Sequence, residues 1–323
     1  MILITGGAGY IGSHCLLDFS RAGYDCVVFD NLSEGHKEAV NTEHFYQGDL
    51  SNIDDIRGVF SKYPIEAVVH FAASCYVGIS VSRPQDYYYN NVVNTLNLLK
   101  VMLEKDVKKF VFSSSCATYG DPLYVPIDEK HSQNPINPYG KTKLMIENIL
   151  KDYDKAYGMK YMMLRYFNAS GADNEANIGE SHDPETHLIP LVLQTAMGQR
   201  DSIKVFGNDY NTPDGTCIRD YIHVNDLAQA HRLALGKLFQ GSESNFYNLG
   251  IGKGYSVNEI IEISEKVSGK TINKEIVERR EGDPPELVAS NEKARQELGW
   301  NPIFTDIKDI IESAWYWETN RRY

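Results

Sequence analysis

Three side chains in the middle of the chain could carry out acid–base chemistry. Ser115 lies in the stretch FSSSCATYG, and Tyr139 and Lys143 lie in the stretch NPYGKTK. If NPYGKTK begins a helix, Tyr139 and Lys143 occupy positions i and i+4 and share one face. A free tyrosine has a pKa of about 10, and a neighbouring positive charge favours the phenolate. The three residues could therefore remove a proton from an alcohol, with Ser115 relaying the proton or holding the hydroxyl.

The elements that would position these side chains can be predicted from the flanking residues. Asn137 can cap a helix and Pro138 fits its first turn, so a helix is expected to begin there. The apolar run KKFVF predicts a buried strand that ends at the serines. A further helix is expected over residues 84–105, opened by a proline and apolar on one face.

The first thirty residues predict a dinucleotide-binding unit. The apolar strand ILIT leads into a glycine-rich turn, a helix from about Tyr10 to Gly23, and the buried strand CVVFD. Glycines allow such a turn to approach a pyrophosphate closely at the N-terminus of the helix. They fit two templates, GxGxxG with Gly7, Gly9 and Gly12, and TGxxGxxG with Gly6, Gly9 and Gly12.

Asp30 ends the second strand, about 20 residues after the last of these glycines. A carboxylate at this place can accept hydrogen bonds from the adenosine ribose hydroxyls and repels a 2′-phosphate, which favours NAD over NADP. A turn that only packs a helix against a sheet would not explain Asp30. The positively charged nicotinamide of NAD would also favour a phenolate at Tyr139.

Strands and helices keep alternating through the first half of the chain. HFYQGD, which ends at Asp49, and IEAVVHFAA are the further strands. This alternation predicts an α/β fold with a Rossmann-like, doubly wound parallel sheet. Ligands of such sheets lie beyond the carboxyl ends of the strands, where Asp30, Asp49, Ala72 and the serines fall. After LRYFN the alternation breaks down into a polar, loop-like segment.

Composition restricts the partners of the protein. The chain has 323 residues and a net charge of −12, which argues against nucleic-acid and anionic-membrane surfaces. No apolar run approaches the roughly 18 residues of a membrane span. Five cysteines without a CxxC pair favour a reduced, cytoplasmic protein. His182, Asp183 and His187 are potential metal ligands, but their spacing matches no common motif, so no metal site is expected.

Together these segments resemble the extended short-chain dehydrogenase/reductase family, and within it the UDP-glucose 4-epimerase type. The resemblance covers almost the whole chain. The motifs that carry it are TGGAGYIGSH, DNL, GD, HFAA, FSSSCATYG, NPYGKTK, LRYFN, GNDYNTPDGTCIRDYIHV, YNLG and RREGDPPELVAS. Sugar-nucleotide dehydratases of the wider family carry an Asp–Glu pair just after the serine. Here Cys116 and Ala117 occupy those positions, which disfavours dehydration.

The resemblance implies an NAD-binding domain over residues 1–168, with a return segment near 217–250, and a smaller lobe over 169–323 that mainly binds the UDP-sugar. The implied activity is interconversion of UDP-glucose and UDP-galactose by transient oxidation at C4 with tightly bound NAD. The implied catalytic residues are Ser115, Tyr139 and Lys143. The implied cofactor contacts are Gly6, Gly9, Tyr10, Ile11, Gly12, Asp30, Asn31, Leu32, Ser33, Gly35, Asp49, Leu50, Phe71, Ala72, Ala73, Asn90, Ser113, Tyr139, Lys143, Tyr166 and Phe167.

For the nucleotide sugar, the resemblance implies a second set of contacts. Two of its members, Arg219 and Arg280, suit a diphosphate, because a planar guanidinium binds phosphate oxygens in pairs. The implied substrate contacts are Ser115, Tyr139, Asn168, His187, Leu188, Lys204, Phe206, Arg219, Tyr221, Arg280, Asp283 and Leu287. The family also pairs the helices that begin at Pro84 and Pro138 with those of a second copy, which implies a homodimer. Candidates for this outer face are Val93, Leu144 and Ile149.

Some features widen the range of expected functions. Leu287 stands where a tyrosine is associated with enzymes restricted to UDP-glucose and UDP-galactose, so UDP-GlcNAc is also an expected substrate. Cys75 replaces a lysine that contacts the cofactor in many members, which leaves the tightness of NAD retention open. SSSCATYG also occurs in relatives that act on UDP-pentoses. A UDP-pentose 4-epimerase, another NAD-dependent sugar-nucleotide oxidoreductase or decarboxylase, and a non-catalytic NAD-sensing protein therefore remain alternatives.

Overall fold

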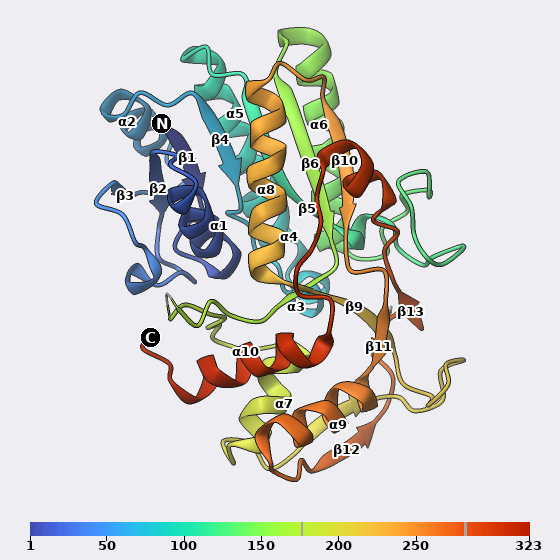
Figure 1. Cartoon of the computed structure of the whole chain (residues 1–323). Helices are drawn as coiled ribbons and strands as arrows, with labels where there is room; N and C mark the ends of the chain where they lie inside the picture. The colour runs from blue at the N-terminus through green and yellow to red at the C-terminus, as the bar shows by residue number, and fades with distance from the viewer. Residues whose placement is uncertain (176, 281–282) are drawn as a thin grey trace.

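A large parallel sheet forms the first of two lobes in the computed structural model, which describes residues 1–175, 177–280 and 283–323 (Figure 1). Its strand order is β10-β6-β5-β4-β1-β2-β3, and every neighbouring pair is parallel. The expected α/β, Rossmann-like, doubly wound sheet is therefore confirmed. Its strands are β1 (Ile2–Thr5), β2 (Cys26–Asp30), β3 (Phe45–Gln47), β4 (Ala67–His70), β5 (Lys109–Ser115), β6 (Lys160–Tyr166) and β10 (Asn245–Leu249).

Helices cover both faces of this sheet because side chains of its strands alternate between two apolar layers. Ile2 and Ile4 pack into one layer and Leu3 into the other, as the period of two in a strand requires. The first layer is covered by α1 (Tyr10–Arg21) and α8 (Val224–Phe239), and the second by α2 (Ile53–Lys62), α5 (Asn94–Glu104) and α6 (Pro138–Tyr157). Strands buried on both faces explain the continuous apolar runs in the sequence.

The helix expected over residues 84–105 is interrupted. It begins as α4 (Pro84–Tyr87), continues as a π-helical segment over Tyr88–Val93, and ends as α5. The wider π turn changes which side chains face inward and is common at functional sites. Here it turns Asn91 into the interior and places Asn90 at a cavity. A short helix, α3 (Val77–Ser82), precedes it.

The smaller lobe lies below the carboxyl ends of the large sheet in Figure 1. A four-stranded sheet joins β7 (Asn168–Ser170), β9 (Ile218–His223), β11 (Gly254–Ser256) and β13 (Glu286–Leu287). A two-stranded sheet joins β8 (Ile203–Phe206) and β12 (Lys274–Val277). The helices of this lobe are α7 (Leu188–Ala196), α9 (Val257–Ser268) and α10 (Ile307–Thr319), and they share an apolar core.

The segment near residues 217–250 contributes to both lobes. α8 packs against α1, and β10 pairs with β6 at the edge of the large sheet. β9, at the beginning of the segment, belongs instead to the four-stranded sheet of the smaller lobe. The return to the large sheet therefore begins at Val224, after β9. Among the described residues, no helix has the length and apolar character needed to cross a membrane.

Candidate active site

A cavity of about 1180 Å³ lies at the carboxyl ends of the large sheet and extends into the smaller lobe. Pockets for a single small ligand usually measure roughly 300–1,000 Å³. The cavity therefore has room for two ligands side by side. Its wall on the large-sheet side includes residues that follow β1, β2, β4 and β5, which is where a doubly wound sheet binds ligands.

The glycine-rich turn after β1 has no space for a side chain at Gly6 or Gly12. A Cβ atom at Gly6, which has a φ of +71°, would lie 2.6 Å from the backbone nitrogen of Ala72. A Cβ atom at Gly12 would lie 2.2 Å from the carbonyl oxygen of Gly6. Gly6, Gly9 and Gly12 line the cavity, so the TGxxGxxG template describes the turn. Gly9 is the N-cap of α1 and offers no side-chain hydrogen bond to the backbone N–H groups of the first turn. A helix start of this kind can bind a phosphate group.

Asp30 holds this turn in place from the end of β2. Its carboxylate accepts hydrogen bonds from the backbone N–H groups of Ala8 (3.0 Å) and Leu32 (2.8 Å). Burial raises the pKa of Asp30, while these two hydrogen bonds oppose the rise. Asn31 beside it donates to the carboxylate of Asp49 at 2.8 Å. The ends of β2 and β3 thus present two carboxylates to the cavity, which suits ribose hydroxyls.

Ser115, Tyr139 and Lys143 lie together in the cavity wall. Ser115 is the last residue of β5, and the other two lie one turn apart on α6. The predicted start of α6 is confirmed, because the Asn137 side chain accepts a hydrogen bond from the backbone of the first turn and Pro138 is the first helical residue. Each of the three side chains is more than nine-tenths buried. The sequence spacing therefore does bring the three residues together.

Burial dominates the protonation of these groups in the protein alone. Burial raises the pKa of Tyr139 well above its usual value, Tyr166 and Cys75 add to the rise, and the nearby Ser115 hydroxyl opposes it. Burial also lowers the pKa of Lys143 to about 8. The Lys143 ammonium donates to the carbonyl oxygen of Ser113 at 2.8 Å and lies 5.8 Å from the centre of the Tyr139 ring. The expected lowering of the Tyr139 pKa by Lys143 is thus outweighed by burial.

Three basic residues gather on the smaller-lobe side of the cavity, although the whole chain carries a net charge of −12. Arg219 on β9 lies 3.4 Å from the carboxylate of Asp283. The guanidinium of Arg280 stacks 4.4 Å from the centre of the Phe206 ring. Lys204 on β8 completes the group. Such a local concentration of positive charge suits a diphosphate.

Leu287 contacts both a buried apolar cluster and the cavity. It pairs with Arg219 in the register between β13 and β9. Its side chain packs against a small buried cluster that includes Tyr119 and Phe167, and it also lines the cavity. Leu287 is therefore part of the cavity wall and not only a core residue. Glu281 and Gly282, which precede it in the motif RREGDPPELVAS, lie outside the described residues.

Of the predicted site residues, all of which the structure describes, only Leu32 and Ser113 lie outside the lining of the cavity. Leu32 has a φ of +61° at the turn after Asp30, and Ser113 supports Lys143 and Tyr166 from behind. The lining also includes residues outside the predicted set, among them Glu34, Ser74, Asn94 and Glu180, as well as Cys75 and His182, which the sequence analysis noted for other reasons. Ser74 and Cys75 directly follow the strand end HFAA, so their position in the sequence could have indicated them.

The cavity, the glycine-rich turn and the Ser–Tyr–Lys group define a nucleotide-dependent enzyme of the Rossmann-like class. The chain belongs to the NAD dependent epimerase/dehydratase family, whose model matches residues 2–250. The resemblance inferred from the motifs is thereby confirmed, and the cofactor of this family, NAD, fits the glycine-rich turn and the carboxylates described above.

Within that family, several similar proteins are named UDP-glucose 4-epimerase. A curated relative from Halalkalibacterium halodurans, a UDP-glucose 4-epimerase, is 52% identical over 98% of this chain and 95% of its own. A crystal structure of UDP-glucose 4-epimerase from Brucella ovis in complex with NAD has a TM-score of 0.95 and 48% identity over 97% of each chain. The UDP-Glc/GlcNAc 4-epimerase of Campylobacter jejuni has a TM-score of 0.86 and 44% identity over 98% of each chain.

Proposed function

We propose that this protein is an NAD-dependent UDP-glucose 4-epimerase that interconverts UDP-glucose and UDP-galactose. The observation that carries the proposal is the single cavity that joins the glycine-rich turn, the Ser115–Tyr139–Lys143 group and the three basic residues. A dinucleotide fits one end of this cavity and a nucleoside diphosphate the other. The reacting group of the sugar would then lie between them, beside Tyr139.

In the proposed reaction, Tyr139 removes the proton from the C4 hydroxyl of the sugar and later returns it. NAD, when bound, accepts hydride from C4 and gives it back. Ser115 holds the hydroxyl or relays its proton, and Lys143 is fixed next to Tyr139 by its hydrogen bond to the Ser113 carbonyl. Because burial alone raises the pKa of Tyr139, the positive charges of Lys143 and of NAD, when bound, would have to hold Tyr139 as a phenolate for it to accept this proton.

Inversion at C4 requires that the sugar ring present first one face and then the other to the same position beside the cofactor. Arg219, Arg280 and Lys204 would hold the diphosphate, so the ring can turn without loss of the nucleotide. The diphosphate would be bound tightly and the sugar ring loosely. The contacts to the diphosphate are then equally good for both orientations of the ring. The size of the cavity is consistent with such a turn.

The substrate range is proposed to extend to UDP-GlcNAc and UDP-GalNAc. Leu287 presents an aliphatic side chain without a hydroxyl to the cavity, so an N-acetyl group meets no polar group that would be left unsatisfied. The similarity to a protein described as a UDP-Glc/GlcNAc 4-epimerase supports this extension. UDP-pentoses, which lack the C6 group, also fit by size and belong in the test.

We further propose a homodimer that acts in galactose metabolism in the cytoplasm. Val93 on the π segment is 40% exposed and Met145 on α6 is 43% exposed, while Leu144 and Ile149 are half-buried. Ile149 packs against the core, so it is a weaker candidate for the outer face than Val93. All five cysteines are free thiols, as expected of a protein from a reducing compartment.

The function is tested by incubating purified protein, without added NAD, with UDP-galactose, UDP-GlcNAc or UDP-xylose and resolving the products by anion-exchange chromatography. Formation of UDP-glucose without net accumulation of NADH supports an epimerase. Dependence on added NAD with stoichiometric NADH would show a dehydrogenase or decarboxylase instead. Absence of product from every sugar would leave a binding protein as the better description. The Tyr139→Phe variant controls for contaminating activity.

A further inference from the structure

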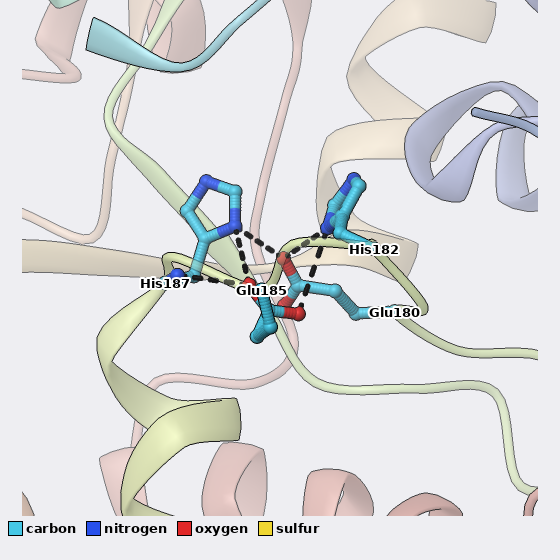
Figure 2. Close-up of side chains that lie close together, drawn as sticks. All are labelled: Glu180, His182, Glu185 and His187. Atoms are coloured by element: carbon cyan, nitrogen blue, oxygen red, sulfur yellow. Dashed lines mark hydrogen bonds and ion pairs between the residues drawn. The ribbon is translucent and has the colours of Figure 1, made fainter. Parts of the chain in front are cut away.

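A cluster of four potential metal ligands lies in the loop between β7 and α7. Glu180, His182, Glu185 and His187 each present one donor atom, and these donors lie within 4.8 Å of one another (Figure 2). The loop is irregular, and its spacing of two, three and two residues matches no helical or strand period. Asp183, which the sequence suggested as a third ligand beside the histidines, is not part of the cluster.

The distances within the cluster match the edges of a four-coordinate metal site. His187 Nδ1 lies 2.7 Å from a carboxylate oxygen of Glu180 and 3.2 Å from one of Glu185. His182 Nδ1 lies 3.2 Å from Glu180 and 3.7 Å from Glu185. Ligands about 2.0–2.1 Å from a tetrahedral ion are separated by about 3.3 Å. The four histidine–carboxylate distances scatter around this value, with Glu185 facing His187 through Oε1 and His182 through Oε2.

Several of these atoms lack the hydrogen bonds that would satisfy them without an ion. Oε1 of Glu180, Nδ1 of His182 and Oε2 of Glu185 are buried and have no hydrogen-bond partner among the described residues. They lie within ion-pair distance, but their directions do not meet hydrogen-bond geometry. Glu180 is only 4% exposed. Unsatisfied buried polar atoms that point at one centre indicate a missing partner at that centre.

A divalent cation can balance the charge of the cluster, as two protonated imidazoles also would. The cluster combines two buried carboxylates, and a buried negative charge is costly unless it is compensated. One divalent cation neutralises both carboxylates and leaves both imidazoles neutral, which is the form that binds metals. A set of two imidazoles and two carboxylates, with four short edges, suits Zn²⁺ better than Mg²⁺ or Ca²⁺, which prefer oxygen ligands and higher coordination numbers.

We propose that Glu180, His182, Glu185 and His187 bind one Zn²⁺ ion as a structural site. This revises the expectation of no metal that followed from residue spacing alone. The ion takes no part in the proton transfer proposed at Tyr139, but Glu180, His182 and His187 line the same cavity, and His187 is also an expected substrate contact.

Its role would be to fix the β7–α7 loop between the two lobes. Trp317 of α10 donates to the backbone of Glu180 at 2.7 Å, and His36, which follows β2, lies 3.2 Å from the carbonyl oxygen of Ser181. The loop also leads directly into Leu188 at the cavity. An ion that crosslinks the loop to itself would therefore hold one wall of the cavity in place.

The test measures zinc on the full-length protein after removal of metals with a chelator and titration with Zn²⁺. Unmodified protein should bind about one Zn²⁺ per chain, measured by mass spectrometry of the metal, and should melt at a higher temperature with zinc than with chelator. The variant His182→Gln should lose at least about tenfold in affinity, since even residues that only support metal ligands are worth 10–100-fold. It should also lose the zinc-dependent rise in melting temperature.

The matched control is His44→Gln, which removes a histidine that is 44% exposed and lies 3.8 Å from the Asp25 carboxylate. It should bind zinc like the unmodified protein. Equal affinity in His182→Gln would place the ion elsewhere, and no bound zinc in unmodified protein would show that protons neutralise the cluster. Either result overturns the proposal.

If His182→Gln does not fold, the proposed site is tested with the visible spectrum of Co²⁺ bound to the unmodified protein. Strong four-coordinate bands that added Zn²⁺ abolishes support the site. A spectrum of a six-coordinate or aqueous ion refutes it.

Discussion

Replacement of Arg165 by methionine should destabilise the protein strongly. Arg165 on β6 is 2% exposed and forms a bidentate ion pair with Glu147 on α6, at 2.8 Å and 2.6 Å. It also donates to the Tyr119 hydroxyl at 2.9 Å. Glu147 is fully buried and accepts further hydrogen bonds from Ser114 on β5 and from Gln133. This network joins α6, which carries Tyr139 and Lys143, to the two strands beneath it.

The size of the effect follows from what the change leaves behind. Hydrogen bonds to charged groups contribute about 1.5–3 kcal/mol each, and Arg165→Met removes two of them from Glu147. The remaining carboxylate stays buried without its counter-charge, for which a loss of about 3–5 kcal/mol is typical. At roughly 2 °C per kcal/mol, the melting temperature should fall by about 6–10 °C. Glu147→Leu should cost a similar amount, because it leaves the guanidinium buried.

The assay is a double-mutant cycle in chemical denaturation. The double variant, with methionine at 165 and leucine at 147, removes both charges, so its loss should be smaller than the sum of the two single losses by at least about 2 kcal/mol. Arg57→Met is the matched control, because its ion pair with Glu104 at 2.9 Å is exposed and should contribute less than about 1 kcal/mol. If the two single losses sum to the loss of the double variant within about 0.5 kcal/mol, the two residues are not coupled. If Arg57→Met loses as much stability as Arg165→Met, burial is not the cause of the effect.

Four further predictions concern the site and the assembly. Tyr139→Phe should leave bound NAD in place and reduce turnover by about 10² to 10⁴, measured with UDP-galactose; turnover within threefold of the unmodified protein would remove Tyr139 from the mechanism. Asp30→Ala should bring the dissociation constants for NADP and NAD closer together, because the carboxylate that repels a 2′-phosphate is gone. Equal binding of both cofactors by the unmodified protein would contradict this role of Asp30. Leu287→Tyr should abolish conversion of UDP-GlcNAc while UDP-galactose is still converted, since a rigid ring occupies the space of the N-acetyl group; equal loss of both substrates would show that Leu287 does not control access. Val93→Asp should convert a dimer into a monomer in sedimentation velocity at micromolar concentration, because it places charge on the proposed apolar interface; a monomeric unmodified protein would rule out the dimer.

Much of the nucleotide-binding half could be predicted because its signals are local. The start of α6 follows from the adjacent Asn137 and Pro138, which satisfy the backbone groups of the first turn themselves. The place of Ser115 at the cavity follows from a general rule, since parallel strands end at the same edge of the sheet and ligands bind beyond that edge. Even there, local signals had limits. The apolar pattern over residues 84–105 indicates one helix, but the π segment that places Asn90 depends on packing against α6.

The smaller lobe and the proposed metal cluster were decided only by the tertiary structure. β9 alternates like any half-buried strand, and its sequence does not show that it leaves the large sheet to pair with β7, β11 and β13. His182 and His187 are visible in the sequence, but Glu180 and Glu185 become ligands only through the path of an irregular loop held by α10 and the segment after β2. The sequence by itself determined most elements of the first half, the glycine-rich turn and the candidates for proton transfer, because periodicity and capping act within a few residues. Contacts between distant segments determined the rest, because side chains without periodic spacing acquire neighbours only when the whole chain has folded.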